Sequence, residues 1–160
     1  MRFTVLTRNL LLVVLATLLL SACATKVKKV GGQLQGDVYT GTETVEYLAK
    51  GVPDRVFFAT NESILTTRSR DTLRKQAAWM RSNSSLNFTI EGHADERGTR
   101  EYNLALGERR ANAAKDYLMT YGVSGNRLSV ISYGKERPVN SGSNPLAWSQ
   151  NRRSVTVKAN

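Results

Sequence analysis

The sequence has very few of the side chains that most often build metal and redox sites. Among its 160 residues there is one cysteine, Cys23, and one histidine, His93. A single cysteine cannot form an internal disulfide, and a catalytic zinc site usually takes several histidine or cysteine ligands. No serine stands in a G-x-S-x-G context. These absences argue against a zinc hydrolase and against a serine hydrolase.

The chain also lacks a hydrophobic run long enough to cross a membrane. The longest, LLLVVLATLLL from Leu10 to Leu20, would span about 16 Å as a helix, roughly half of a hydrocarbon core. It follows Arg2 and Arg8, which is the order of a secretory signal peptide. We therefore expect residues 1–22 to be a leader that exports the chain.

The segment LSAC, which ends at Cys23, resembles the lipobox of bacterial lipoproteins, where cleavage leaves a lipid-bearing cysteine at the new N-terminus. An ordinary signal peptide is the alternative, but it would place the sole cysteine at the cleavage point by chance. Two or more acyl chains give a stable membrane anchor where one chain is marginal. We therefore predict lipidation of Cys23.

Positive charge is in excess but is not gathered into one block. The formal net charge is +10 and becomes +8 once Arg2 and Arg8 leave with the leader. The densest group is Lys26, Lys28 and Lys29, and no five basic residues follow one another. In an exported lipoprotein this favours an acidic polymer of the cell envelope as a partner, and not a nucleic acid.

Composition divides the mature chain into a tether and a domain. Residues 23–51 hold glycines, threonines and few large apolar side chains, which is typical of a flexible tether with an extended reach of roughly 90 Å. Its last piece, VEYLAK at 45–50, could already pack on the domain. We expect residues 52–160 to form that single domain.

Strand and helix patterns alternate through residues 52–160. Alternating apolar residues predict strands, a 3.6-residue period predicts helices, and Gly122 is a good residue to end the second helix. The order predicts an α/β two-layer sandwich of helices on a mixed β-sheet, β-α-β-α-β-β, with a short helical turn before the last strand. The expected strands are 54–58, 86–93, 126–134 and 154–160, and the expected helices are 66–83, about 100–121 and 144–153.

The segment EGHADERGTREYNLALGERRANA, from Glu91 to Ala113, mixes arginines with carboxylates around His93. Two of its carboxylates could form the pair of a glycosidase. The interleaved arginines would instead hold the carboxylates ionised, which opposes the raised pKa that a general acid needs. The simplest role of His93 is that of a polar residue at a strand end. We therefore expect no enzyme and no metal site here.

The spacing of this segment brings particular side chains together. Asp95 follows a strand and so lies in a loop at the sheet edge, where α/β folds commonly bind ligands. Asn103, Leu106 and Arg110 are spaced i, i+3, i+7 and share one stripe of the next helix. A partly buried Arg110 needs an anionic partner, either Asp95 or Glu91 in a structural salt bridge, or a ligand. Spacing alone leaves both open.

Three motifs resemble one known family. They are EGHADERGTREYNLALGERRANA, ISYGKERP and WSQNRRSVTV, in that order between Val56 and the C-terminus. They resemble the OmpA-like peptidoglycan-binding domain family and, with LSAC, its lipoprotein branch, the peptidoglycan-associated lipoproteins (Pal). The resemblance implies binding of the meso-diaminopimelate of the peptidoglycan stem peptide without cleavage. It also implies TolB and the other Tol proteins as partners, and a lipid-anchored place on the periplasmic face of the outer membrane.

The family motif also assigns residues to the ligand. Asp95 would take the ammonium, and Arg110 the carboxylate, of the zwitterionic end of diaminopimelate, while Asn103 would orient the loop or add a hydrogen bond. The family usually has aspartate at the position of Asn61, so a neutral partner here could weaken binding. The segment 151–153 is expected to be mainly structural, with contact to the glycan or to Asp95 as the alternative. The residues implied to bind the ligand are Asp95, Arg110, Asn61, Phe58, Thr60, Asn103 and Leu106.

Two other functions stay open at this point. A wall-acting glycosidase would use the carboxylates between 91 and 101, and it would turn over purified peptidoglycan. A nonspecific cationic adhesin would lose binding as salt rises, whatever the state of Asp95. No cofactor is expected for any of the three.

Overall fold

The structure, a computed structural model, describes residues 34–159. The predicted leader and Cys23 lie outside the described residues. No helix within the described range is both long and apolar enough to cross a membrane. The elements are β1 (Leu34–Gln35), β2 (Val38–Tyr39), β3 (Tyr47–Ala49), β4 (Val52–Pro53), β5 (Arg55–Phe57), α2 (Thr67–Ser82), β6 (Phe88–His93), α3 (Arg100–Thr120), η1 (Gly125–Arg127), β7 (Leu128–Gly134), α4 (Pro145–Asn151) and β8 (Arg153–Lys158).

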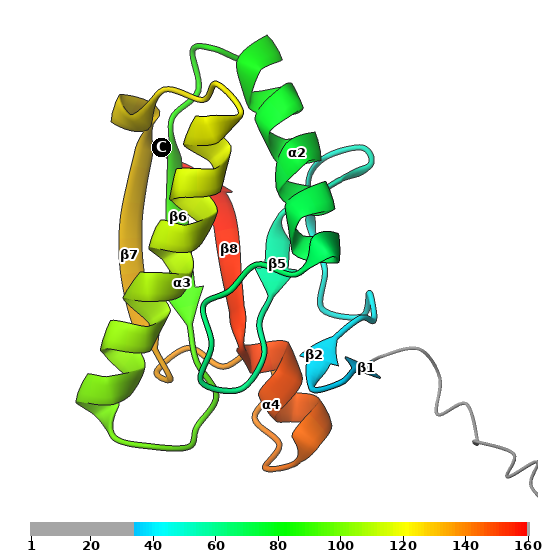
Figure 1. Ribbon diagram of the computed structural model, residues 1–160, viewed down its shortest axis with the longest axis vertical. Coiled ribbons are helices and arrows are strands. Elements are labelled where there is room, and N and C mark those ends of the chain that lie inside the picture. The colour runs from blue at the N-terminus through cyan, green and yellow to red at the C-terminus, as the bar shows by residue number, and fades with distance from the viewer. Residues whose placement is uncertain (1–33, 160) are drawn as a thin grey trace, which may run out of the picture. The chain divides into compact units, whose positions relative to one another are not determined.

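Four strands form one mixed sheet in the order β5-β8-β6-β7. β8 is antiparallel to both β5 and β6, whereas β6 and β7 are parallel. Helices α2 and α3 cover one face of this sheet, and α4 lies at one end beside β2 (Figure 1). This is the predicted two-layer α/β sandwich, so the fold class is confirmed.

The two long helices begin and end where the sequence predicts. Thr66 caps α2 by accepting a hydrogen bond from Ser69 N at 3.1 Å, and Thr99 caps α3 by accepting one from Tyr102 N at 3.2 Å. After α3 the chain turns at Gly122, whose φ of 82° is left-handed. The core between helices and sheet contains Leu73, Ala77 and Met80 of α2, Phe88 and Ile90 of β6, and Ala111, Ala114 and Leu118 of α3.

Helix α3 crosses β6 at very short range. A Cβ placed on Gly92 would lie 1.8 Å from the carbonyl oxygen of Gly107, so neither backbone could keep its place. Two glycines thus let α3 approach the end of β6. Arg110, one turn further along α3, reaches the carbonyl oxygen of His93, the last residue of β6, as a result.

The stretch that the sequence assigns to the tether, residues 23–51, is folded from Leu34 onward. Tyr39 is 1% exposed, and its ring packs edge-on against Phe57 with centroids 4.8 Å apart. Leu48, in the VEYLAK piece, joins the core as expected. β1 to β4 hold two or three residues each, which is too short to show a hydrophobic period. Residues 24–33 lie outside the described residues, and a tether there stays a prediction.

The Gly92–Gly107 crossing gives a test of the fold. We expect Gly92→Ala to lower the free energy of unfolding by about 3 kcal/mol, because a methyl group there collides with backbone. Gly51→Ala is the control: Gly51 has open space around it but a φ of 76°, so it should cost only about 1–2 kcal/mol. Urea unfolding measures both, and equal losses would contradict the close crossing.

Candidate ligand-binding site

Asp95 lies directly after β6, in the loop that leads to α3, and is 7% exposed. Its Oδ1 accepts hydrogen bonds from Arg97 N at 3.1 Å and Arg97 Nε at 3.0 Å, and its Oδ2 accepts one from Arg97 Nη2 at 2.8 Å. Burial alone would raise the pKa of Asp95, but the bonds from Arg97 and Arg152 outweigh burial and lower it. Asp95 is therefore a buried, ionised carboxylate at the sheet edge.

Arg152 brings a second guanidinium to Asp95 from the far end of the chain. It is 2% exposed, and its Nη1 donates to Asp95 Oδ2 at 3.3 Å. Its Nε donates to the carbonyl oxygen of Phe58 at 3.1 Å, and its Nη2 donates to that of Asp37. Burial lowers the pKa of Arg152. Arg152 thus ties the end of β5 and the N-terminal segment to the Asp95 loop.

The loop after Asp95 is held at several points along its backbone. Asn103 of α3 donates from Nδ2 to the carbonyl oxygen of Arg97 at 2.9 Å. Lys135 donates from Nζ to the carbonyl oxygens of Glu96, at 3.2 Å, and Gly98, at 2.7 Å. Asn103 therefore has the loop-orienting contact that the motif suggests.

Side chains of the same loop also fasten it to α4. The carboxylate of Glu96 accepts hydrogen bonds from Trp148 Nε1 at 2.9 Å and from Ser143 Oγ at 3.0 Å. The guanidinium carbon of Arg97 lies 4.4 Å from the centroid of the Trp148 ring, a cation–π distance. α4 and the Asp95 loop therefore form one connected end of the molecule.

Arg110 projects from α3 into this end and is fully buried. Its Nε donates to the carbonyl oxygen of Glu62 at 2.8 Å, its Nη1 to that of His93 at 2.8 Å, and its Nη2 to that of Ala59 at 3.0 Å. A guanidinium has five N–H donors, so one N–H on each Nη lies outside these bonds. Burial, and then the charge of Arg152, lower the pKa of Arg110 to about 9, while the charge of Asp95 acts to raise it.

The structural ion pair that the sequence left open for Arg110 is not formed. Within residues 34–159 its guanidinium contacts backbone carbonyls, and neither Asp95 nor Glu91 makes an ion pair with it. A buried cation is thus solvated by dipoles but not neutralised by a carboxylate.

The loop between β5 and α2 contributes a tight turn to the same end. Glu62 N donates to the carbonyl oxygen of Ala59 at 3.3 Å, and Asn61 has a left-handed φ of 56°, a conformation that asparagine and aspartate tolerate. The carbonyls of Ala59 and Glu62 are two of the three acceptors of Arg110. Thr60 Oγ1 accepts from Arg97 Nη2 at 3.3 Å. Arg110 and Arg97 therefore fix the turn from two sides.

The predicted ligand residues meet at this end, but at different depths. Thr60 is half-buried and Asn61 is exposed. Phe58, Asn103 and Leu106 are 0%, 2% and 3% exposed, so they support the site from within, and as ligand contacts they stay predictions. The guanidinium carbon of Arg110 lies 5.3 Å from the centroid of the Phe58 ring.

Sequence reasoning missed three residues of the site. Arg97 belongs to the quoted motif, but sequence reasoning assigns it no role. For Arg152 it predicts a mainly structural role. Asp37 fell in the expected tether, yet its Oδ2 accepts from Thr60 N at 2.6 Å and lies 3.7 Å from Arg152 Nη2. A signal existed for Arg152, since a contact with Asp95 was the alternative for the segment 151–153.

The other two residues of that segment have structural partners. Asn151 Oδ1 accepts from Val139 N at 2.8 Å and Asn140 N at 3.0 Å, which shapes the loop before α4. Arg153 lies on the sheet face away from the helices and donates from Nη2 to the carbonyl oxygen of Arg137 at 3.2 Å. These contacts agree with the expected structural role of both residues, which stays a prediction.

The carboxylates of the glycosidase alternative do not converge. Asp95 and Glu96 are committed to the bonds above, and both have lowered pKa values. Burial raises the pKa of Glu91, but Glu91 lines a hollow with Arg137 and Arg153 on the sheet face away from the helices. Among residues 34–159 no group of three His, Cys, Asp or Glu comes together to hold a metal ion.

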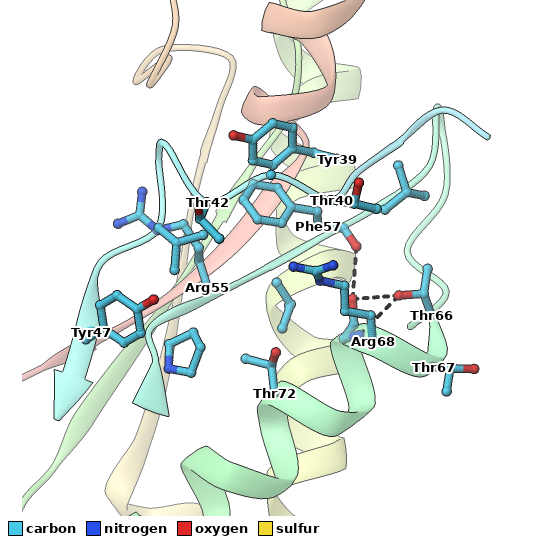
Figure 2. Close-up of a pocket in the computed structure, with 16 residues that line it drawn as sticks. Tyr39, Thr40, Thr42, Tyr47, Arg55, Phe57, Thr66, Thr67, Arg68 and Thr72 are labelled. Atoms are coloured by element: carbon cyan, nitrogen blue, oxygen red, sulfur yellow. Dashed lines mark hydrogen bonds between the residues drawn. The ribbon is translucent and has the colours of Figure 1, made fainter. Parts of the chain in front are cut away.

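A cavity of about 510 Å³ lies beside this end, between residues 38–47 and the start of α2 (Figure 2). Aromatic rings, threonines and two arginines line it, and the lining includes no acidic side chain. Asp95, Arg110, Asn61 and Asn103 are not part of the lining either. The predicted site is therefore the shallow end of the sheet, separate from this cavity.

Comparison with known proteins identifies the family of the chain. The OmpA family profile matches residues 57–152. A peptidoglycan-associated lipoprotein of Rhizobium meliloti is 44% identical over 160 residues, which is 98% of this chain and 91% of the relative. The chain belongs to the OmpA family. Within that family, the peptidoglycan-associated lipoprotein of Brucella melitensis is 55% identical over 106 residues, or 66% of this chain and 63% of the relative.

Solved structures of OmpA-family proteins share the fold. The crystal structure of the peptidoglycan-associated lipoprotein from Burkholderia pseudomallei has a TM-score of 0.65 at 36% identity, covering 66% of this chain and 90% of that one. The C-terminal domain of Helicobacter pylori MotB has a TM-score of 0.62 at 19% identity, over 67% of this chain and 84% of that one, and shows the fold alone. The resemblance of the motifs to the OmpA-like lipoproteins is confirmed.

His93 gives a pH test of the site's support. It is 1% exposed at the end of β6, and burial together with nearby arginines lowers its pKa to about 3 from the usual 6.5. The fold disfavours the imidazolium, so the free energy of unfolding should be highest above pH 6.5. It should fall by about 1.4 kcal/mol per pH unit as the pH drops towards 3. Urea unfolding between pH 7 and 4.5 measures this slope.

Two neighbouring carboxyl groups define the controls for that slope. The pKa of Asp95 is lowered, so protonation of Asp95 reduces the free energy of unfolding only below pH 3.8, the ordinary pKa of an aspartate. Glu91 has a raised pKa and acts in the opposite direction, so the comparison is made in a Glu91→Gln background. There, His93→Gln should flatten the slope between pH 6.5 and 4.5. A slope that persists without His93 would contradict its burial in the neutral form.

Proposed function

We propose that this chain is a lipid-anchored envelope protein that binds peptidoglycan without cleaving it. Its family membership supports this, since relatives that are 44% and 55% identical bear the name peptidoglycan-associated lipoprotein. The dispersed positive charge agrees with a binding role. So does the finding that the carboxylates of the glycosidase alternative do not converge into a catalytic pair. The ligand group is the zwitterionic end of meso-diaminopimelate in the stem peptide.

One observation carries the choice of ligand: a buried carboxylate and a buried guanidinium lie at the same end without pairing with each other. Asp95 is near enough to act on the pKa of Arg110, yet Arg110 bonds only to carbonyls among the residues described. Buried charges are normally paired, because an unpaired one has lost its hydration. A ligand with a carboxylate and an ammonium on one carbon supplies the anion that Arg110 lacks, while its ammonium can share the Asp95 carboxylate with Arg97 and Arg152.

The groups left open fit the two halves of such a ligand. One N–H on each Nη of Arg110 lies outside the carbonyl bonds, which suits a carboxylate. The ammonium would bind Asp95, where Thr60 and the side-chain oxygen of Asn61 can accept further hydrogen bonds. Because Arg110 is 0% exposed, the turn over residues 59–62 must shift when the carboxylate enters.

Attachment at both ends makes the chain a connection between membrane and wall. Cys23 would carry the lipid on the periplasmic face of the outer membrane, and residues 24–33 would be the tether. TolB and the other Tol proteins are proposed as partners on the strength of the family resemblance. They would compete with the wall for this end of the domain.

Titration of the domain with a diaminopimelate-containing stem peptide tests the site. We expect Asp95→Asn to weaken binding by about tenfold to a hundredfold, because it removes the negative charge that would bind the ammonium at nearly constant shape. Arg110→Lys should weaken it at least as much. Arg109→Ala is the matched control, since Arg109 is the exposed neighbour on the same helix.

Arg110 also supports three backbone segments, so thermal unfolding must accompany its titration. If Arg110→Lys does not fold, Asp95→Asn alone decides the result. Binding that survives Asp95→Asn but fades with salt would make the protein a cationic adhesin. Release of sugar fragments from purified peptidoglycan would make it an enzyme.

Asn61 gives a substitution that should improve binding. We expect Asn61→Asp to raise the affinity for the stem peptide severalfold, because a charged acceptor for the ammonium is stronger than a neutral one. The left-handed φ of 56° suits aspartate as well as asparagine, so stability should hardly change. Unchanged affinity would place Asn61 outside the contact with the ammonium.

A further inference from the structure

The outer face of α2 concentrates positive charge that the ligand site does not use. Five of its 16 residues are basic and one, Asp71, is acidic. All five basic side chains are exposed on the side of α2 away from the core. They are Arg68, Arg70, Arg74, Lys75 and Arg81.

Most of this charge is unpaired within the domain. Asp71 is bonded to Arg74, and Arg81 donates to the carbonyl oxygen of Tyr121. The side chains of Arg68, Arg70 and Lys75 form no hydrogen bond or ion pair with any residue of the described range. Three free cations thus lie on the outer side of one helix, with Arg68 and Lys75 towards one flank and Arg70 towards the other.

An aromatic side chain accompanies the cations on one edge of this face. Arg68, Lys75 and Trp79 are spaced i, i+7, i+11 and so share a stripe. Lys158 of β8 lies over the Trp79 ring, with Nζ 5.3 Å from its centroid. Cations beside a half-buried tryptophan are typical of surfaces that rest on lipid headgroups.

The length of chain before the described structure limits how far this face can be from a membrane. Leu34 stands 11 residues after Cys23, which reaches at most about 36–40 Å when fully extended. Three of those residues are lysines, which anionic lipid also attracts. In Figure 1, β1 lies beside β2 and α4, at the end of the domain where α2 begins. A lipidated Cys23 therefore keeps α2 at a high effective concentration near the bilayer.

We propose that the outer face of α2 docks on the anionic headgroups of the membrane that holds Cys23. The proposal rests on the lipidation proposed above. Arg68, Arg70 and Lys75 meet the lipid phosphates, and Trp79 rests at the headgroup level. The outer face of α2 does not include the Asp95 end of the sheet, so wall binding and membrane contact would use different surfaces. Docking is reversible, because it depends on a few screened charges.

The test uses the mature, lipidated chain reconstituted in vesicles. Ala78→Cys places a single free thiol on the exposed face of α2, and a dye there reports energy transfer to an acceptor on lipid headgroups. We expect strong transfer in vesicles of phosphatidylcholine with phosphatidylglycerol, and weak transfer in pure phosphatidylcholine. Arg70→Gln with Lys75→Gln should lower the docked-to-free ratio about thirtyfold.

A control double substitution distinguishes the effect of where the charges lie from the effect of net charge. Arg109→Gln with Lys50→Gln removes two exposed charges elsewhere and should leave the transfer unchanged. Transfer that ignores lipid charge, or that both pairs lower equally, would overturn the proposal. Loss of binding to purified peptidoglycan in the α2 pair, with transfer unchanged, would also overturn it, because the face would then belong to the wall. Asp95→Asn reports separately on the proposed wall site and should leave the transfer intact.

Discussion

The candidate site depends on the guanidinium of Arg110 inside the domain. It bonds to carbonyls of the β5–α2 turn and of the end of β6, so one side chain of α3 joins three segments that are distant in sequence. Its position depends in turn on the Gly92–Gly107 crossing, which brings α3 close to β6. The Asp95 loop, held by Arg97, Arg152 and Asn103, is built around the same point.

This arrangement leaves an electrostatic imbalance. Guanidinium groups surround Asp95, whereas Arg110 has only dipoles, and its pKa falls to about 9. Neutralising a buried cation with a ligand carboxylate yields more than the same contact would in water, because little hydration remains to be removed. The imbalance thus explains how a shallow end of a sheet, without a deep pocket, could select a zwitterion.

Much of the fold could be predicted from the sequence. The caps at Thr66 and Thr99 and the turn at Gly122 are local signals, and the period of α2 and the alternation in β6 show directly in the residue pattern. The folded stretch from Leu34 could not be predicted, because strands of two or three residues carry no period. Its contacts, such as Tyr39 on Phe57, are settled only by the finished sheet.

Some members of the site were predictable from the sequence, but its bonds were not. The motif brought Asp95, Asn103 and Arg110 together, since their spacing places them at one end. That Arg110 would bond to carbonyls could not be foreseen, because every residue has a carbonyl and the sequence does not mark which ones face inward. The role of Arg152 required the pairing of β8 with β5, a contact across 94 residues.

The most direct measurement compares two stem peptides that differ in one group. Binding of the domain to a peptide with meso-diaminopimelate is measured against the same peptide with lysine, which lacks only the distal carboxylate. If the unneutralised Arg110 selects the ligand, the lysine peptide should bind at least tenfold more weakly. Equal binding of the two peptides would contradict the account, because Arg110 would then be structural and the ammonium alone would be recognised.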